Sequence, residues 1–228
     1  MFEDPILKSL IQKYPAPKFE NRSEFLFEDL IESIISQQLS VKASNTIYSR
    51  FKLLFKPAPK RQSKPNAILS ISEGSQSTNR DSSPSVQNDT DKSIALAFPT
   101  FQQILEMPDA TIRTAGISFQ KISYIKNIAT AFANNEIDIK KLNKSTDEEV
   151  IISLTKLKGV GKWTAEMTLI FTLNRPDVFS IGDLGLRNAV EKLYKASDQK
   201  KILKLSEKWK PHRSTASWYL WRSLENKT

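Results

Sequence analysis

Two short strings in the last third of the chain carry the residues best suited to chemistry. The first, LKGVGKWTA at residues 157–165, places a Gly-x-Gly turn directly before a predicted helix. Glycines leave the backbone amides of a turn uncovered, and a helix N-terminus attracts anions. The string therefore predicts a phosphate-binding hairpin, although a helix–turn–helix corner capped by glycine would have the same pattern. The predicted phosphate contacts are Gly159, Val160, Gly161 and Lys162.

The second string, NRPDVFSIGDLGLR at residues 174–187, places Asp183 directly before another predicted helix. Aspartate is a favoured N-cap residue, and a helix N-terminus stabilises negative charge. A carboxylate held there can stabilise a developing positive charge or activate a water molecule. Asp183 is thus both a cap and a catalytic candidate, whereas Asp177 follows a proline and is more typical of a turn.

The residue counts exclude most other catalytic chemistry. The 228 residues include no cysteine and one histidine, His212. Disulfides, thiolate nucleophiles and Cys-ligated zinc or iron–sulfur sites are therefore excluded, as are metal centres with several histidines. We expect His212 to be a loop residue, so catalysis would use carboxylates, hydroxyls, lysines or backbone dipoles.

The positive charge of the chain is concentrated around the same two strings. Residues 154–228 hold 15 lysines and arginines against 7 acidic residues, which accounts for +8 of the net +9. All four tryptophans and four of the six glycines lie there too. A basic surface beside aromatic residues is typical of nucleic-acid binding. Soluble helices over a tryptophan-containing core would give the same composition.

Hydrophobic periodicity predicts an all-α fold. Apolar residues repeat at helical spacing, and alternating strand patterns are missing. Ser145 and Glu148 fit a capping box that opens one of the helices. The apolar stripes are Phe27, Leu30, Ile31, Ile34 and Ile35; Ile47, Phe51, Leu54 and Phe55; Trp163, Met167, Ile170 and Phe171; Leu186, Val190 and Leu193; and Ala216, Leu220 and Leu224.

Residues 60–93 depart from this pattern, with nine serines and no aromatic residue. Such a segment cannot bury enough apolar surface to offset its ordering entropy, so we predict a disordered insertion. The remainder of residues 1–228 is expected to form a single domain. No apolar run approaches the roughly 20 residues of a membrane span, so no membrane partner is expected.

Together these strings resemble the helix–hairpin–helix superfamily of DNA glycosylases, which also has a Gly/Pro-rich loop and an aspartate. Residues 27–40 look like the family segment that enters the DNA minor groove. Residues 98–100, 116–121, 209–214 and 218–221 resemble the alkylation-repair branch, DNA-3-methyladenine glycosylase II. The resemblance covers the whole chain except 60–93 and implies a two-lobed helical fold.

The implied function is that of a monofunctional DNA glycosylase. It would flip out alkylated purines such as 3-methyladenine and hydrolyse the N-glycosidic bond, initiating base excision repair. One alternative is the same fold acting on deaminated or oxidised bases. Another is a non-catalytic helix–hairpin–helix DNA-binding protein, which would not need the carboxylate of Asp183 facing DNA phosphates.

The resemblance also implies a role for individual residues. Asp183 matches the catalytic aspartate. Trp163 stands where strand-cleaving relatives have a Schiff-base lysine, so no lyase activity is expected. Trp163, Trp221 and Met167 would form the base pocket, because an aromatic face suits a cationic alkylated purine. Gln38 would be the minor-groove wedge that replaces the flipped base, with Gln37 as the competing candidate.

The resemblance implies no required cofactor. The backbone carbonyls of Thr155, Leu157 and Val160 match positions that bind a monovalent cation in relatives, so a structural Na⁺ or K⁺ is expected at the hairpin. The expected partner is double-stranded DNA containing damaged bases, bound by a monomer. The expected location is the cytoplasm or nucleoid in a prokaryote and the nucleus in a eukaryote.

Overall fold

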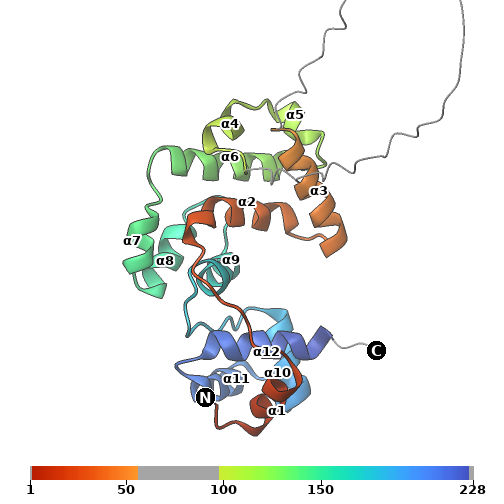
Figure 1. The fold of residues 1–228 in the computed structure, drawn as a ribbon, viewed down its shortest axis with the longest axis vertical. Coiled ribbons are helices and arrows are strands. Elements are labelled where there is room, and N and C mark those ends of the chain that lie inside the picture. The colour runs from red at the N-terminus through yellow and green to blue at the C-terminus, as the bar shows by residue number, and fades with distance from the viewer. Residues whose placement is uncertain (1, 56–97, 226–228) are drawn as a thin grey trace, which may run out of the picture.

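The computed structural model describes residues 2–55 and 98–225, and every regular element in these ranges is a helix (Figure 1). The predicted all-α class is confirmed, whereas the predicted insertion at 60–93 lies outside the described residues. The longer helices are α1 (Pro5–Lys13), α2 (Leu26–Ser36), α3 (Val41–Leu53), α6 (Phe119–Ala133), α8 (Asp147–Leu154), α10 (Leu184–Tyr194), α11 (Gln199–Ser206) and α12 (Arg213–Glu225). The shorter elements are η1 (Ser23–Phe25), α4 (Phe101–Glu106), α5 (Asp109–Arg113), α7 (Ile139–Lys144), α9 (Lys162–Met167), the π-helical turn η2 (Thr168–Thr172) and η3 (Glu207–Trp209).

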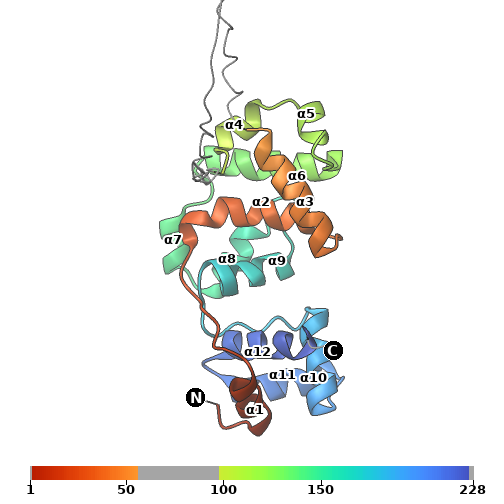
Figure 2. The same ribbon diagram turned by 45° about the vertical axis from the view of Figure 1, so that its right-hand side comes forward.

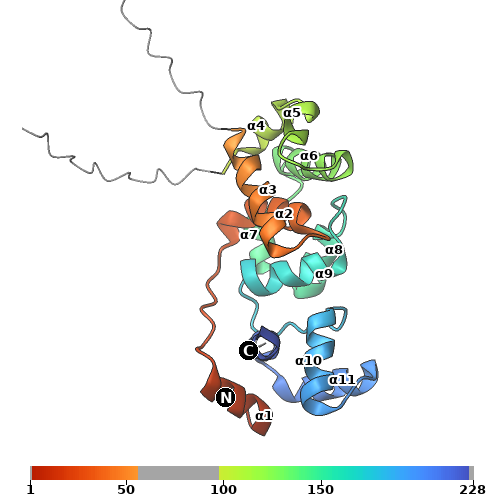
Figure 3. The ribbon, with the colours of Figure 1, turned by 90° about the vertical axis from the view of Figure 1, so that its right-hand side faces the viewer.

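The helices enclose two hydrophobic cores, one in each of two lobes (Figures 1 and 2). Helices α2 to α9 form the first core, and α1 joins α10, α11 and α12 in the second. Two segments pass between the lobes, one from α1 to α2 and one from η2 to α10 (Figure 3). Trp221 on α12 packs against both cores, so it marks the junction of the lobes.

Helix α2 packs one face into the first core, and another of its faces lines a cavity of the candidate active site. Leu30, Ile31 and Ile34 are fully buried, as their spacing predicts. At the C-terminal end of α2, Lys121 Nζ donates hydrogen bonds to the backbone carbonyls of Ile35 (2.8 Å) and Gln37 (2.7 Å). These bonds satisfy carbonyls that have no partner within the helix, and they fix the position of the following loop.

The capping box of α8 lies one residue later than predicted. Thr146 is the N-cap: its hydroxyl accepts from the Glu149 amide at 3.2 Å, and Glu149 accepts from the Thr146 amide at 2.8 Å. Ser145 instead donates its hydroxyl hydrogen to the Lys141 carbonyl, and its own carbonyl accepts from Arg175 at 2.8 Å. The prediction of Ser145 and Glu148 was therefore wrong, because the distant Arg175 holds Ser145 outside the helix.

Candidate active site

The hairpin between α8 and α9 requires a glycine at position 159. Gly159 has φ +86°, and a Cβ atom there would lie 2.4 Å from Cδ2 of Tyr124 and 3.0 Å from Cδ1 of Ile34. Gly161 has φ −90°, and a Cβ atom at that position would meet nothing within 4 Å. The fold therefore requires glycine at position 159, whereas at Gly161 the outer surface of the hairpin has no side chain over it.

Contacts from both sides hold the hairpin in place. Gln37 Nε2 donates to the Gly159 carbonyl at 3.0 Å, and the Lys158 amide donates to Asn127 Oδ1 at 2.8 Å. The side chains of Leu157 and Val160 are buried in the first core. The turn is thus fixed against α2 and α6 before any ligand arrives.

Not all the predicted phosphate contacts are available to a ligand. The Val160 amide donates to the Leu157 carbonyl at 3.1 Å. The amides of Gly159 and Gly161 have no acceptor within residues 2–55 and 98–225. The Lys162 side chain is 69% exposed, with Nζ 3.8 Å from Glu166 Oε1. Two amides therefore have no acceptor, and the Lys162 ammonium beside them is largely exposed although it is paired with Glu166.

Asp183 caps α10 and binds two tryptophans at the same time. Its Oδ1 accepts from the Leu186 amide at 2.7 Å and from Trp221 Nε1 at 2.9 Å. Its Oδ2 accepts from Trp163 Nε1 at 2.8 Å. These bonds bring together three residues predicted for the site. The two indoles contact the carboxylate through their N–H groups.

Gly185 makes room for this arrangement. A Cβ atom at position 185 would lie 3.1 Å from Asp183 Oδ1 and 3.1 Å from Cδ1 of Trp221. Such contacts are tighter than ordinary packing allows, so a larger residue would push the indole away from the carboxylate. The second glycine of the GDLG string therefore serves the contact between Asp183 and Trp221.

A cavity of about 320 Å³ lies between α2 and the α9–η2 segment. Trp163, Met167 and Phe171 line it, at i, i+4 and i+8 along the chain. Trp221 is not part of the lining but packs against Phe171, with ring centroids 5.7 Å apart. Two of the three predicted pocket residues thus line the cavity and the third adjoins it.

Phe171 is the aromatic pocket residue that sequence reasoning missed. It is 42% exposed, whereas its neighbour Ile170 is buried. Both lie in the π-helical turn, in which the Leu173 amide donates to the Thr168 carbonyl at 2.9 Å. The spacing of Phe171 from Trp163 and Met167 was the available signal.

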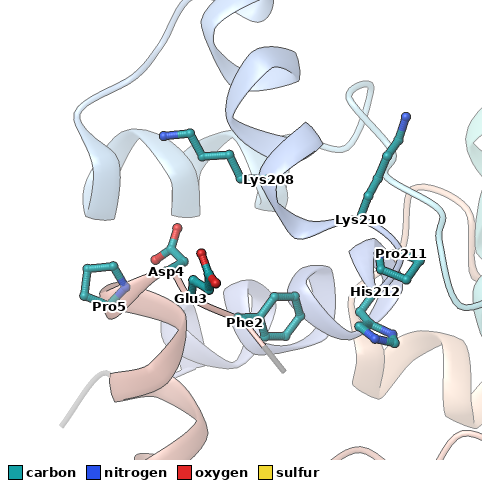
Figure 4. A pocket seen from close by; sticks show the side chains of 8 residues that line it. All are labelled: Phe2, Glu3, Asp4, Pro5, Lys208, Lys210, Pro211 and His212. Atoms are coloured by element: carbon teal, nitrogen blue, oxygen red, sulfur yellow. The ribbon is translucent and has the colours of Figure 1, made fainter.

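A larger cavity, of about 690 Å³, lies elsewhere in the second lobe (Figure 4). His212, Phe2 and Lys208 are among its lining residues, and it shares no lining residue with the smaller cavity. Its Asp4 carboxylate is already occupied by backbone amides of α1 and by Trp209 Nε1. His212 is the loop residue that was predicted, and this cavity contains neither Asp183 nor its tryptophan partners.

Asp177 ties the loop before Asp183 to α12. Its carboxylate accepts from Arg213 Nε at 2.8 Å and from Arg213 Nη2 at 3.0 Å. Burial would raise the pKa of Asp177, but the hydrogen bonds and positive charge of Arg213 outweigh it and hold that pKa below its ordinary value. Asp177 is therefore a structural residue, as its place in the turn suggested.

The Asp177–Arg213 pair gives the protein a pH-dependent contribution to stability. We expect Asp177→Asn to lower the free energy of unfolding by about 1–3 kcal/mol at neutral pH, because one partner of a charged hydrogen bond is lost. A carboxyl pKa that is lower in the folded protein adds stability above the unfolded pKa, and this is lost as the pH falls through the folded value. Urea unfolding of both proteins from about pH 7 to about pH 3 should show the difference shrinking below the ordinary value of 3.8. A difference that stayed constant over this range would contradict the account.

The two glutamines considered as the minor-groove wedge have different surroundings. Gln37 is held by its bond to Gly159, and its own carbonyl accepts from Lys121. Gln38 is exposed in the loop between α2 and α3, with φ +60°. Of the two glutamines, Gln38 is therefore the more exposed.

The predicted cation ligands lie in one turn. Thr155 is the C-cap of α8, and Leu157 and Val160 follow within the hairpin. The Leu157 carbonyl accepts from the Val160 amide, while the carbonyls of Thr155 and Val160 accept no hydrogen bond from any described residue. Oxygen donors of this kind suit a hard cation. No group of three His, Asp or Glu side chains that could hold a metal occurs in the described part of the chain.

Comparison with known proteins identifies the family of the chain. The family model "HhH-GPD superfamily base excision DNA repair protein" matches residues 31–212. The chain belongs to this superfamily. It is therefore a DNA glycosylase of the helix–hairpin–helix type.

Individual HhH-GPD relatives are also similar over most of the chain. DNA-3-methyladenine glycosylase 1 of Schizosaccharomyces pombe is 35% identical over 201 residues, covering 86% of this chain and 72% of that protein. The structure of S. pombe 3-methyladenine DNA glycosylase (Mag1) in complex with abasic DNA superposes with a TM-score of 0.71 at 32% identity, covering 99% of this chain and 94% of that chain. A DNA-3-methyladenine glycosidase from Bacillus halodurans gives 0.67 at 27% identity, with 98% and 91% covered. In the described residues, no helix has the length and hydropathy of a membrane span.

Proposed function

We propose that this chain is a monofunctional DNA glycosylase that removes alkylated purines such as 3-methyladenine from double-stranded DNA. The observation that carries the proposal is the carboxylate of Asp183, held by two indole N–H groups beside an aromatic cavity. The names of the relatives from S. pombe and B. halodurans support the same substrate class. The product would be an abasic site, so the reaction would begin base excision repair. It would take place in the compartment that holds the DNA of the host.

The positive charge of the alkylated base would favour both its binding in the cavity and the cleavage of its bond to the sugar. Alkylation at a ring nitrogen makes the purine cationic, and a cation binds well against an electron-rich aromatic face. The cavity offers such faces from Trp163 and Phe171. The positive charge also makes the base a good leaving group, so the reaction needs no strong general acid.

Asp183 would act on the sugar. As the bond from C1′ to the base nitrogen breaks, its electron pair leaves with the base and positive charge develops on the sugar. A fixed carboxylate stabilises that charge and orients the water molecule that attacks C1′. The water proton passes to Asp183 or to solvent, which leaves a hydroxyl group on C1′ and a free base.

Strand cleavage is not expected. A lyase needs an amine that forms a Schiff base with the opened sugar. Trp163 has no such amine, and the adjacent Lys162 extends toward the buried carboxylate of Glu166. The site therefore favours hydrolysis by water.

The hairpin and the α2–α3 loop would hold the DNA. The free amides of Gly159 and Gly161 and the exposed Lys162 side chain would contact phosphate, and Gln38 would fill the gap left by the flipped base. A Na⁺ or K⁺ at the carbonyls of Thr155, Leu157 and Val160 would add positive charge near the same phosphate. No other cofactor is proposed, and the protein would act as a monomer.

The wedge proposal predicts different effects for the two adjacent glutamines. Gln38→Ala is expected to lower base release by about tenfold with little loss of stability, because flipping costs a few kcal/mol that a plug partly offsets. Gln37→Ala is expected to lower the free energy of unfolding by about 1 kcal/mol, because the bond to Gly159 is lost. Base release and urea unfolding measured on both variants separate the roles. Equal effects on both measurements would contradict the assignment.

The test of the function uses duplex DNA treated with a methylating agent. After incubation with the full chain, chromatography should detect free 3-methyladenine or 7-methylguanine, and the DNA strand should stay intact until alkali is added. Sodium borohydride should trap no covalent protein–DNA adduct. Absence of free base would reject the glycosylase proposal, and a trapped adduct would reject its monofunctional part.

A further inference from the structure

The cavity beside Trp163 has an acidic wall as well as an aromatic one. Asp29, Glu32, Ser33 and Ser36 occur at i, i+3, i+4 and i+7 on α2, and all four line the cavity. This spacing places them on one helix face, away from the buried isoleucines. The aromatic residues come from α9 and η2, so the two walls are built by different helices.

The two carboxylates on this wall have different surroundings. Asp29 accepts from Thr172 Oγ1 at 2.7 Å, and its Oδ1 lies 3.6 Å from Nη2 of Arg22. No hydrogen bond or ion pair joins the side chain of Glu32 to any other described residue. Asp29 is thus committed to holding η2 and Arg22 against α2, whereas Glu32 is free to meet a ligand.

The surroundings of Glu32 favour the arrival of a cation. Partial burial, and then the negative charges of Asp29 and Glu28, raise the pKa of Glu32 above its ordinary value, against the opposing effect of Lys52 and Arg22. A positive charge placed in the cavity would offset the repulsion among these carboxylates. A neutral molecule of the same shape would not offset this repulsion.

We infer that Glu32 is a specificity-determining residue that selects cationic, N-alkylated bases over neutral bases of similar size. This inference rests on the proposed function, since it concerns the base that enters the same cavity. Aromatic faces attract a cationic base, but they also stack on any flat neutral base, so they do not by themselves exclude normal purines. The free carboxylate adds a preference for charge, which normal purines lack.

The first experiment compares one cationic and one neutral lesion. Duplexes containing a single 7-methylguanine or a single 1,N6-ethenoadenine are incubated with the wild type, with Glu32→Gln and with Glu191→Gln. Glu191 is an exposed residue of α10 outside the cavity, so it controls for the loss of one negative charge. We expect Glu32→Gln to lower the ratio of cationic to neutral release by about tenfold, and Glu191→Gln to leave that ratio unchanged. An unchanged ratio in Glu32→Gln would overturn the inference.

The second experiment does not depend on catalysis. Calorimetry at pH 7.5 compares the binding of 1-methylquinolinium, a flat cation, with that of neutral quinoline. The wild type should bind the cation more tightly by about tenfold, and Glu32→Gln should lose the difference. This result would support the inference even if no base were released from DNA, an outcome that rejects only the proposed function. Equal binding of the two probes by the wild type would overturn the inference directly.

Discussion

Replacing Gly159 with alanine is expected to lower the free energy of unfolding by about 2–5 kcal/mol. A left-handed backbone conformation costs a non-glycine residue about 1–2 kcal/mol, and forced overpacking adds about 1–3 kcal/mol. Both apply here, because Gly159 has φ +86° and its Cβ atom would lie 2.4 Å from the ring of Tyr124. The displaced hairpin would also bind DNA less tightly. Urea unfolding and a DNA-binding titration measure the two effects.

Gly161→Ala is the matched control for this substitution. Gly161 has an ordinary φ of −90°, and a Cβ atom there meets nothing within 4 Å. The free energy of unfolding should fall by no more than about 1 kcal/mol, which is the usual cost of a poor N-cap residue. Equal destabilisation by the two variants would show that the conformation of the hairpin is not set by Gly159.

The sequence predicted the hairpin but not the difference between its two glycines. A Gly-x-Gly turn between helical stripes is a local pattern, and local patterns can be read from spacing. The demand for glycine at 159 comes from Tyr124, which lies 35 residues earlier in the chain and packs against the turn. Such a contact exists only once the first lobe has folded.

The candidate site could also be predicted only in part, because its contacts join residues that are far apart in the sequence. Asp183 was recognisable as a helix cap, and its role came from the family resemblance. Its bonds to Trp163 and Trp221 join residues 20 and 38 positions apart, so the spacing of the residues gave no indication of them. Glu32 was not considered as a site residue, because a charged residue on an amphipathic helix is usually on a solvent-facing surface.

Replacing Asp183 with asparagine is expected to lower the rate of base release by at least about a hundredfold. The negative charge that would stabilise the sugar cation is removed, while the side-chain shape is kept. Asparagine is also a good N-cap, so its oxygen can still accept from the Leu186 amide and the free energy of unfolding should change by less than about 1 kcal/mol. Its NH₂ group would face Trp163 Nε1, which loses its acceptor.

Asp198→Asn controls for the chemical change itself. Asp198 is the N-cap of α11 and accepts from the Lys201 amide at 3.0 Å, but it contacts neither tryptophan of the site. The same replacement at this cap should leave base release unchanged. Any loss common to both variants would come from altered capping rather than from the lost charge near the sugar.

The most direct measurement is single-turnover release of free base from a duplex containing one 7-methylguanine, with the enzyme in excess. Wild type and Asp198→Asn should release the base at the same rate, and Asp183→Asn should bind the duplex with similar affinity but release the base at least about a hundredfold more slowly. Equal rates for wild type and Asp183→Asn would contradict the assignment of Asp183 as the catalytic carboxylate.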